Sequence, residues 1–574
     1  MSNGDNEQSL WEELKRRNVV RVGLAFAGAA WILVQVASVF IPALGLPDGL
    51  MTVIAVACIA GFPVALVIAW VYEWTSEGLV RDSSPRVRSG IGFGGRHIDY
   101  FIIGMLTVAV SWFALDKFYW SKSASTKIPT IAVLPFENIS DDSSREYFAE
   151  GLSEEILNLL TRIEGLRVIG RTSAFQFKDR PEDLREIGQK LSADYLLEGS
   201  VRIVNQQLRI NTHLVNVADG VRIWSDTFNG NFDDAFRLQE LIARAAVAQL
   251  KMEFLAIVKA PDSGDAYDAY LQGLRFNRIP DAGNAVKAVH KLELSVQLDP
   301  SFAPAWLQLF RAYSLQTRFG QMTTEEGDPK MRETVSRALE ADPKSADVHS
   351  ALGHFEMWHN FDLAAAETAY IRALELVPEH PGALGGAAAL AAARGRLDEA
   401  LAYTFRVQQV DPLGLSGMHN EAFYNYLNRD YQAAEKKYRE TLEFAGESYL
   451  VGRAMLALCL IAQGKYREAH SESLNEKAES QRLAVQSISL LKLERMEEAQ
   501  QALDRLIEKH GDRLPIPIAG SFAQRGEFDD AIRWIERAYQ QKNPQLLWLK
   551  VHPVFDPLQD DPRVPELIER LHLN

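Results

Sequence analysis

The chain has 574 residues, of which 47% are hydrophobic and 24% charged, an ordinary composition for a folded protein. This length predicts several domains rather than one core. The formal net charge of −15 argues against nucleic acid as a partner, because a nucleic-acid surface needs clustered Lys and Arg. We expect no disulfide between the two cysteines, Cys58 and Cys459.

Three apolar stretches occupy the first 120 residues, at about 22–41, 52–71 and 100–118. Each approaches the roughly 20 residues that a helix needs to cross a bilayer, so we expect three transmembrane helices in a membrane anchor of residues 1–125. A cleaved signal peptide is the alternative for the first stretch, whose apolar core is too long for one. No charge lies at the centre of any stretch, which favours an anchor over a transport path.

Basic residues predict the orientation of these helices. Four of them precede the first stretch and four lie between the second and the third: Lys15, Arg16, Arg17, Arg21, Arg81, Arg86, Arg88 and Arg96. Because Lys and Arg are retained in the cytoplasm, the amino terminus is expected inside and everything after the third stretch outside. The expected partners of this region are the lipid bilayer and, through small-residue pairs such as Gly23 and Ala27, a second copy of the chain.

A block of strands and helices is expected between residues 126 and 256. Its predicted elements are a strand at 131–136, a helix at 147–163, a strand at 166–169, a helix at 184–191, strands at 195–203, 207–215 and 221–224, and a helix at 233–253. The break at Asn205 and Gln206 predicts a hairpin. This order indicates a small α/β domain, in which helices pack on a mixed sheet.

Three segments of this block carry a family resemblance. Ile131–Asn138, Tyr147–Leu152 and Ala193–Arg202 resemble the TolB-like amino-terminal domain, which precedes tetratricopeptide repeats in bacterial multi-domain proteins. The resemblance implies a bacterial membrane-anchored protein. Together with the orientation predicted from the basic residues, it leads us to expect an inner-membrane protein with its later domains in the periplasm. Relatives of this kind often carry a nucleotide-cyclase domain and are labelled adenylate cyclase for that reason. No such domain is recognisable here, so a cyclase label would be a mislabelling.

Acidic pairs are the candidate catalytic residues of this block. Asp141 and Asp142 lie in a Ser/Asp turn, where such residues usually cap the next helix. Asp194 and Glu198 flank a strand, and no complementary His, Cys or Lys has a recognisable spacing. The sequence also lacks a Walker loop, a GxSxG elbow and an HExxH helix. We therefore expect no catalytic residue, no cofactor and no enzyme.

The carboxy-terminal half repeats itself. A turn followed by a helix of small residues begins at 360, 395, 429, 464, 494 and 526, and a proline follows the second helix at 300, 343, 378 and 412. A helix–turn–helix pattern with a period of about 34 is the tetratricopeptide signature. Residues 262–574 are therefore expected to form an all-α superhelix of seven to eight repeats with a carboxy-terminal capping helix. The predicted equivalent core positions on second helices are Tyr370, Phe405, Tyr438 and Ile535.

The concave face of such a superhelix binds other polypeptides, which predicts proteins or peptides as partners. The candidate binding residues are aromatic, because aromatic side chains anchor peptides in grooves: Trp306, Tyr313, Phe319 and Trp358. The alternative is that these rings pack between repeats. An acidic chain should also favour partners that are basic or that carry exposed apolar anchors.

Three histidines invite a metal hypothesis: His349, His354 and His359. A spacing of five residues turns successive side chains about 140° apart on a helix, so we expect no metal site. The function expected from the sequence is a membrane-anchored scaffold that binds protein partners on the periplasmic side. The alternative is a signalling protein that couples periplasmic binding to a separate cytoplasmic effector.

Overall fold

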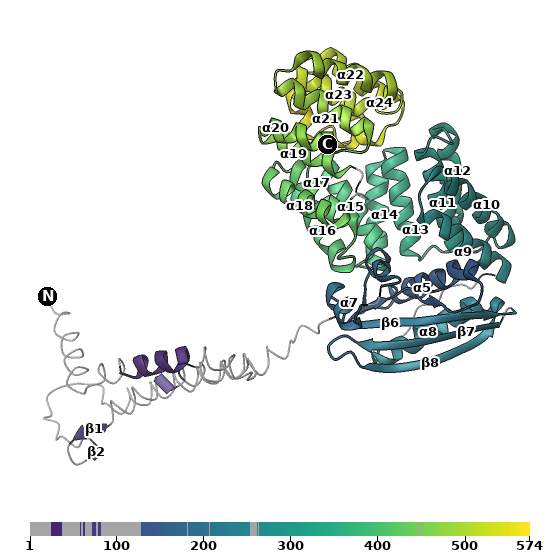
Figure 1. The fold of residues 1–574 in the computed structure, drawn as a ribbon, viewed down its shortest axis with the longest axis vertical. Coiled ribbons are helices and arrows are strands. Elements are labelled where there is room, and N and C mark those ends of the chain that lie inside the picture. Colours follow the sequence, from purple (N-terminus) through teal and green to yellow (C-terminus); the bar gives the residue numbers. More distant parts are fainter. Residues whose placement is uncertain are drawn as a thin grey trace, which may run out of the picture. The chain divides into compact units, whose positions relative to one another are not determined.

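The structure is a computed structural model with two compact units, Met1–Lys127 and Ile128–Asn574. In the first unit it describes residues 25–36, 58, 61–62, 72–75 and 78–81. In the second it describes residues 128–573 apart from 181, 206, 253–260, 262, 447–448 and 450. Figure 1 shows the elements of both units, coloured along the chain.

The described elements of the first unit are a helix over residues 25–36 and the antiparallel strands β1 (Tyr72–Thr75) and β2 (Gly78–Arg81). The prediction of three transmembrane helices is wrong for the part of the chain that the structure describes, where no helix is long and apolar enough to cross a bilayer.

The predicted fold class and localisation are corrected by this finding. A multi-pass inner-membrane protein with periplasmic domains conflicts with the lack of a spanning helix among the described residues. The rest of the ranges 22–41 and 52–71, and the whole range 100–118, lie outside those residues. The described architecture is instead a mostly helical, tetratricopeptide-like superhelix with a small sheet region.

The second unit begins with an α/β block, residues 128–249, built on a six-stranded sheet. Its strands are β3 (Thr130–Val133), β4 (Glu137–Asn138), β5 (Arg167–Val168), β6 (Tyr195–Val204), β7 (Gln207–Asn216) and β8 (Arg222–Asn231). The order is β5-β3-β6-β7-β8, with β4 pairing β6. β3 runs parallel to β5 and β6, whereas β6, β7 and β8 are antiparallel. The sheet is therefore mixed, as the sequence predicts.

Helices cover both faces of this sheet. Along β3, Ile131 and Val133 pack with α5 (Glu146–Leu160) and α8 (Ala235–Gln249), whereas Ala132 faces the core under α7 (Leu184–Lys190). Alternate residues of a strand point to opposite faces, so a strand buried on both sides has a continuous apolar sequence. The predicted hairpin is found between β6 and β7, where Asn205 adopts a positive φ of 49°.

The described residues then form eight helix pairs that wind from α9 to α24 (Figure 1). The pairs are α9 (Gly264–Arg278) with α10 (Ala282–Leu298), α11 (Ala303–Arg318) with α12 (Thr324–Ala341), α13 (Ala346–Phe355) with α14 (Leu363–Leu376), α15 (Pro381–Ala393) with α16 (Leu397–Val410), α17 (Leu415–Leu427) with α18 (Tyr431–Ala445), α19 (Gly452–Ala462) with α20 (Tyr466–Leu474), α21 (Glu479–Lys492) with α22 (Met496–His510), and α23 (Pro515–Arg525) with α24 (Phe528–Gln540).

The turns inside the pairs lie at the predicted positions. Gly395, Gly464 and Gly526 have φ values of 81°, 77° and 77°, in the left-handed region that ends many helices. Arg429 and Glu494 adopt φ values of 62° and 60° at the equivalent positions. Glycine reaches this region without strain, whereas other L-residues adopt it at a cost. The recurring turn is thus a backbone requirement of the repeat.

One predicted core position is wrong. Tyr370, Tyr438 and Ile535 are buried on their helices, but the side chain of Phe405 is 62% exposed. The buried residue of α16 at the equivalent position is Thr404, which lies 34 residues after Tyr370 and 34 before Tyr438. The strict period therefore identifies this position better than side-chain size does.

After the last pair the chain continues as two 3₁₀ helices, η7 (Pro544–Trp548) and η8 (Pro553–Leu558), and then as α25 (Arg563–Arg570). Arg570 forms an ion pair of 2.7 Å with Glu536 on α24, so α25 covers the final repeat. Residues 544–558, called here the tail segment, join the same hydrophobic cluster as α13, α14 and α15. The tail segment thus contacts the middle of the array as well as its end.

Candidate binding cavity inside the repeats

A cavity of about 950 Å³ lies inside the repeat array. Its walls come from the first helices of seven of the eight described pairs, α11 through α23, and from the tail segment. First helices line the inner face because the second helix of each pair packs outside them. Lining residues accordingly recur at nearly the repeat period in Ala351, Gly385, His419 and Met455.

The wall made by α15 is thin. A Cβ atom on Gly386 would lie 2.2 Å from the ring of Tyr370, and one on Gly353 would lie 2.6 Å from it. These two glycines therefore admit the Tyr370 ring between α13 and α15, where it joins the cavity lining. The Tyr370 hydroxyl is buried and has no hydrogen-bond partner among the described residues. A Cβ on Gly385, in contrast, would meet nothing within 4 Å.

Aromatic rings join the tail segment to the middle of the array. The ring of Trp548 lies 6.0 Å from that of Trp358, in the helical turn that follows α13 (Glu356–Asn360), and 5.3 Å from that of Phe423 on α17. Arg429, at the turn between α17 and α18, donates to the carbonyl oxygen of Val551 over 2.6 Å. The tail segment is therefore held as one wall of the cavity.

Three histidines of the lining, His354, His419 and His552, are neutral near pH 7. Burial lowers the pKa of His354 to about 4, helped by the nearby His359, and lowers that of His419 to about 4. Burial also lowers the pKa of His552 to about 3. His354 is open to the cavity, but the surrounding walls displace water and disfavour its charged form. These rings therefore supply neutral polar and apolar surface.

Two lining side chains carry charge, Arg311 and Asp347. Asp347 accepts from His380 at 3.0 Å and lies 4.0 Å from Arg162, so its charge is partly compensated. Arg311 is exposed to the cavity and forms no hydrogen bond or ion pair within the described part of the chain. Burial lowers its pKa from the usual value, and Glu154 acts in the opposite direction. Arg311 is thus a cation without a direct partner.

The structure places the four predicted binding residues differently. Trp358 lines the cavity, and the other three are absent from its lining. Trp306 donates from Nε1 to the carbonyl oxygen of Pro300 over 2.8 Å, and the buried Tyr313 donates to Glu293 over 2.8 Å. Phe319 is half-buried at the end of α11. Arg311 and Trp548 were missed; only the repeat period of the first helices indicates the former, and no periodic signal indicates the latter.

The acidic pairs of the α/β block have structural contacts. Asp142 caps a helix by accepting from the amide of Ser144 over 2.9 Å, as predicted. Asp194 accepts from the amide of Thr130 over 3.0 Å, and Glu198 pairs with Arg222 at 3.0 Å. Among the described residues, no group of three or more His, Cys, Asp or Glu side chains is placed to hold a metal ion.

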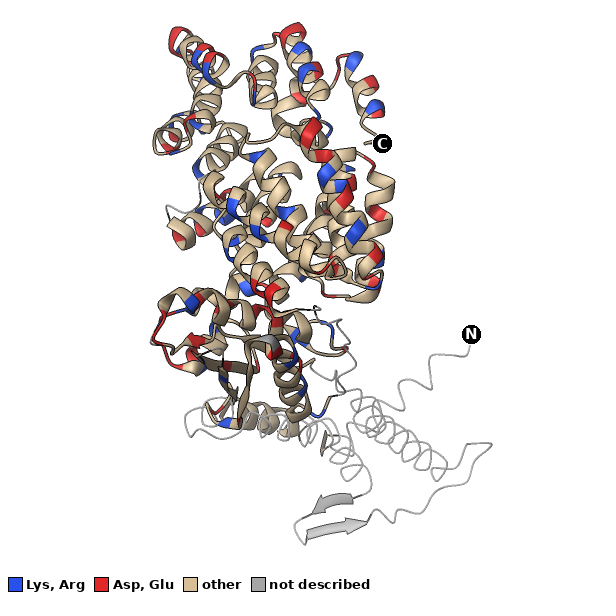
Figure 2. Ribbon diagram, turned by 90° about the vertical axis from the view of Figure 1, so that its right-hand side faces the viewer, with Lys and Arg blue, Asp and Glu red and all other residues tan. Residues whose placement is uncertain are grey.

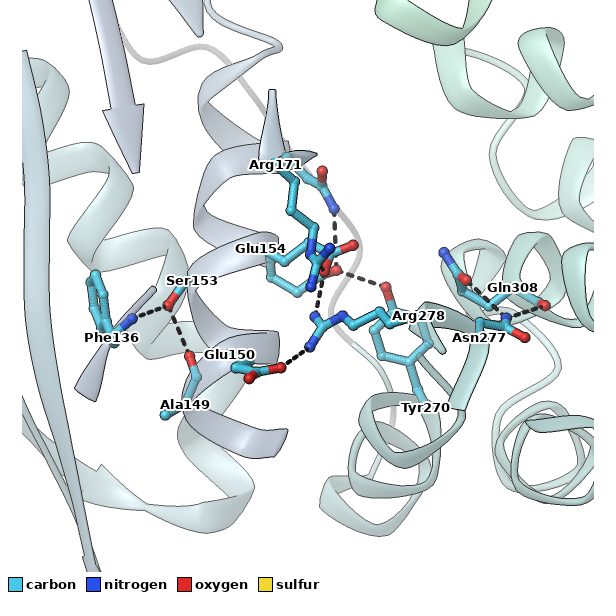
Figure 3. Close-up of polar contacts among 12 residues, drawn as sticks. Phe136, Ala149, Glu150, Ser153, Glu154, Arg171, Tyr270, Asn277, Arg278 and Gln308 are labelled. Carbon is cyan, nitrogen blue, oxygen red and sulfur yellow. Dashed lines mark hydrogen bonds and ion pairs between the residues drawn. The ribbon is translucent and has the colours of Figure 1, made fainter. Parts of the chain in front are cut away.

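The α/β block and the first repeats share one hydrophobic core, which runs from β3 and α5 through α9 to α13. A charged network crosses the same junction (Figure 3). Arg278 of α9 pairs with Glu154 and, over 2.8 Å, with Glu150. Arg171 pairs with Glu154 over 2.7 Å. Beside this network, the buried Glu155 of α5 accepts a hydrogen bond from the hydroxyl of Tyr270 of α9 over 2.7 Å.

A second contact links the block to the fourth and fifth pairs. The amide of Gly170 donates to the carbonyl oxygen of Val410 over 2.5 Å, and the amide of Ser173 donates to Asp411 over 2.9 Å. The amide of Leu413 donates back to the Ser173 hydroxyl over 2.8 Å. The block therefore contacts the array at α9 and again at the turn after α16, which fixes the curvature of the pairs between them.

Comparisons with known proteins cover parts of this chain. Residues 126–245 match the family described as HilA/YgeH-like transcriptional regulator, second domain. A relative from Rhizobium meliloti (strain 1021), named "Putative adenylate cyclase 3", is 31% identical over 191 residues. The match covers 32% of this chain and 32% of the relative, so the chain spans about a third of the length of the relative it matches.

Solved structures are similar at low scores. The type IV pilus biogenesis factor PilW is 17% identical with a TM-score of 0.32, covering 42% of this chain and 98% of its own. TolB from Acinetobacter baumannii is 16% identical with a TM-score of 0.17, covering 21% of this chain and 28% of its own. Scores of this size carry no argument about function. The tetratricopeptide-like character of the repeats is seen directly in the helix pairs.

Proposed function

We propose that this chain is a protein-interaction scaffold whose repeats hold a peptide segment of a partner protein in the cavity. The observation that carries the proposal is the cavity itself, about 950 Å³ in volume and walled by seven inner helices and the tail segment. Binding sites of this size are usually concave and mostly apolar, with a few placed polar groups. Phe423, Trp358 and Trp548 supply aromatic surface that can anchor a peptide.

The proposal assigns no catalysis to the chain. The acidic pairs that the sequence offers as acids cap a helix, bond a strand amide or pair with an arginine. The cyclase name belongs to a relative of which only about a third is matched.

A second candidate function is a regulatory module that passes partner binding to a separate effector. The family match to a domain of a transcriptional regulator favours it. The shared core and charged network offer a mechanical connection between the cavity and the α/β block. If this function holds, ligand binding in the cavity should change amide hydrogen exchange in α5, 146–160. Unchanged amide exchange in α5 would contradict the regulatory function and leave the scaffold function as the remaining candidate.

A photo-crosslinking amino acid tests the scaffold proposal in the full chain. Placed at Met455 in the lining, it should crosslink a partner in extract; placed at Lys436, which is 80% exposed on the outer α18, it should not. Gly385→Phe should abolish the crosslink from Met455, because its side chain enters the cavity where a Cβ meets no atom within 4 Å. Ala364→Phe on the exposed face of α14 is the matched control. Equal crosslinking from both sites, or persistence in Gly385→Phe, would contradict the proposal.

A further inference from the structure

We infer that the peptide held in the cavity carries a carboxylate that pairs with the guanidinium of Arg311. The inference rests on the proposed function and names the chemistry of the partner segment, an apolar or aromatic stretch with an Asp or Glu side chain or a chain terminus. The net charge of −15 predicts partners that are basic or that carry exposed apolar anchors; the inference keeps the apolar anchors and replaces the basic charge by a carboxylate. Figure 2 shows acidic and basic residues interspersed along the repeat helices, so the charges around the cavity, and not the net charge of the chain, determine which peptide it binds.

The charge of Arg311 is the first support. Its neighbour Glu154 is already held by Arg171 and Arg278, and no described carboxylate lies within ion-pair distance of Arg311 itself. An arginine on an open surface would be solvated by bulk water. Arg311 instead lines a concave, partly open cavity, where the protein walls lower the effective dielectric and strengthen a charge pair. A single guanidinium binds one carboxylate through two parallel hydrogen bonds.

The remaining lining is the second support. His354, His419 and His552 are neutral near pH 7, so they add no competing cation for a carboxylate to choose. The carboxylate of Asp347 is partly compensated by His380 and Arg162, so Arg311 is the charged side chain of the described lining that lacks a direct partner. The aromatic rings and the unsatisfied hydroxyl of Tyr370 complete a wall suited to an apolar chain with few polar groups.

A random dodecapeptide display library, selected on the immobilised full chain, tests the inference. Peptides selected by the unmodified chain should be enriched in Asp and Glu beside Phe, Leu or Trp. Arg311→Met should still select apolar peptides but lose the acidic enrichment, and Arg311→Lys should retain part of it. Arg318→Met removes an exposed arginine from the same helix and should behave like the unmodified chain. Replacing Glu by Gln in a selected peptide should weaken binding about tenfold or more, and should change nothing in Arg311→Met.

The outcomes separate this inference from the proposed function. The carboxylate pairing would be overturned, with peptide binding left intact, by peptides whose binding is abolished in Gly385→Phe but which show no enrichment in Asp and Glu. The same holds if the acidic enrichment persists in Arg311→Met. A failure to select any peptide that depends on Gly385 would overturn both. Binding of phosphopeptides in place of carboxylate peptides would also overturn the inference, because the anion would then be a phosphate. Binding of free decanoate in place of peptides would overturn it as well, because the carboxylate would then belong to a fatty acid and not to a peptide.

Discussion

The two ends of the repeat array are covered in different ways. At the amino-terminal end, α9 and α10 pack into the core of the α/β block, and the junction contains Glu150, Glu154 and Arg278 in a charged network. At the carboxy-terminal end the chain covers itself with α25 and the tail segment, through neutral rings such as Trp548. Every solenoid must cover its terminal apolar faces. Both ends contain apolar contacts and ion pairs, but the charged network is buried at the amino-terminal junction, whereas the ion pair of Arg570 with Glu536 at the carboxy-terminal end is partly exposed.

The difference has consequences for stability. Buried charges are costly when one partner is lost or when the ionisation state changes, so the amino-terminal junction should respond to charge substitution and to pH. Aromatic contacts depend on area and fit, so the carboxy-terminal cover should respond to truncation and hardly to pH or salt. The following four experiments test this contrast.

Arg278→Met should have the largest effect. Its side chain is 9% exposed, and its loss leaves Glu150 and Glu154 buried with one cation fewer between them. Breaking a buried ion network in this way costs about 4 kcal/mol. Urea unfolding should show the loss, and hydrogen exchange should locate it in α5 and α9. Arg372→Met, which removes a half-exposed pair with Glu375, should cost less than about 0.5 kcal/mol. Equal effects of the two variants would remove the proposed role of the junction.

Trp548→Ala should cost somewhat less, about 3 kcal/mol, because a large, partly buried ring is lost from between Trp358 and Phe423. The loss should be nearly the same at pH 5 and pH 8. Phe405→Ala truncates an aromatic ring that is 62% exposed and should change stability by less than about 0.5 kcal/mol. A strong pH dependence of the Trp548→Ala effect would contradict the contrast between the two ends.

Glu155 should make the amino-terminal junction sensitive to pH. Burial raises its pKa to about 7, opposed by the hydrogen bond from Tyr270, and Glu154 and Asp347 raise it further while Arg162 lowers it. The raised folded-state pKa means that its contribution is present below the usual value of 4.5 and is lost as pH rises to about 7. Glu155→Gln should therefore be more stable than the unmodified chain at pH 8, by about 2 kcal/mol.

The comparison for Glu155→Gln is made across pH. The two proteins should converge in stability at pH 4, where Glu155 is protonated in both folded and unfolded states. Melting temperatures of both proteins, measured every half pH unit, would show this convergence. A difference that is constant from pH 4 to pH 8 would mean that the substitution acts through packing and not through the charge.

Glu494→Gly should have the smallest effect and the opposite sign. Glu494 has a φ of 60° at a turn where three other pairs have glycine. Glycine removes the strain of this conformation but increases the entropy of the unfolded chain, so a net gain of about 0.5 kcal/mol is expected. Because the gain comes from the backbone conformation and not from a buried charge, it should be independent of pH. A loss of stability in urea unfolding would show that the Glu494 side chain makes a favourable contact.

The sequence predicted the repeats well because their signal is local. Positive φ values recur at Gly395, Gly464 and Gly526, where the turn pattern placed them, and α16 ends at Val410, just before the predicted proline marker. The hairpin at Asn205 is equally local. The predicted core position Phe405 is one residue away from the buried Thr404, because side-chain size favours Phe405 whereas the repeat period identifies Thr404. The three apolar stretches were read from hydropathy alone, and the described helices do not support that interpretation.

The candidate site was predicted only in part. Trp358 reaches the cavity, whereas Trp306 and Tyr313 have polar partners elsewhere. Aromatic type does not reveal which face of a helix a residue occupies once the superhelix curves. The repeat period of the first helices is the better signal, since it connects Ala351, Gly385 and His419.

The sequence by itself determined the helix pairs, their turns and the succession of the main strands and helices along the α/β block, because these depend on periodicity and turn chemistry within short segments. Only the tertiary structure decided that Trp548 meets Trp358 across 190 residues and that the block contacts the array twice. It also decided that Arg311 faces a cavity without a partner. Such features follow from how the pairs curve and which distant surfaces meet, and these long-range contacts leave no periodic pattern in the chain.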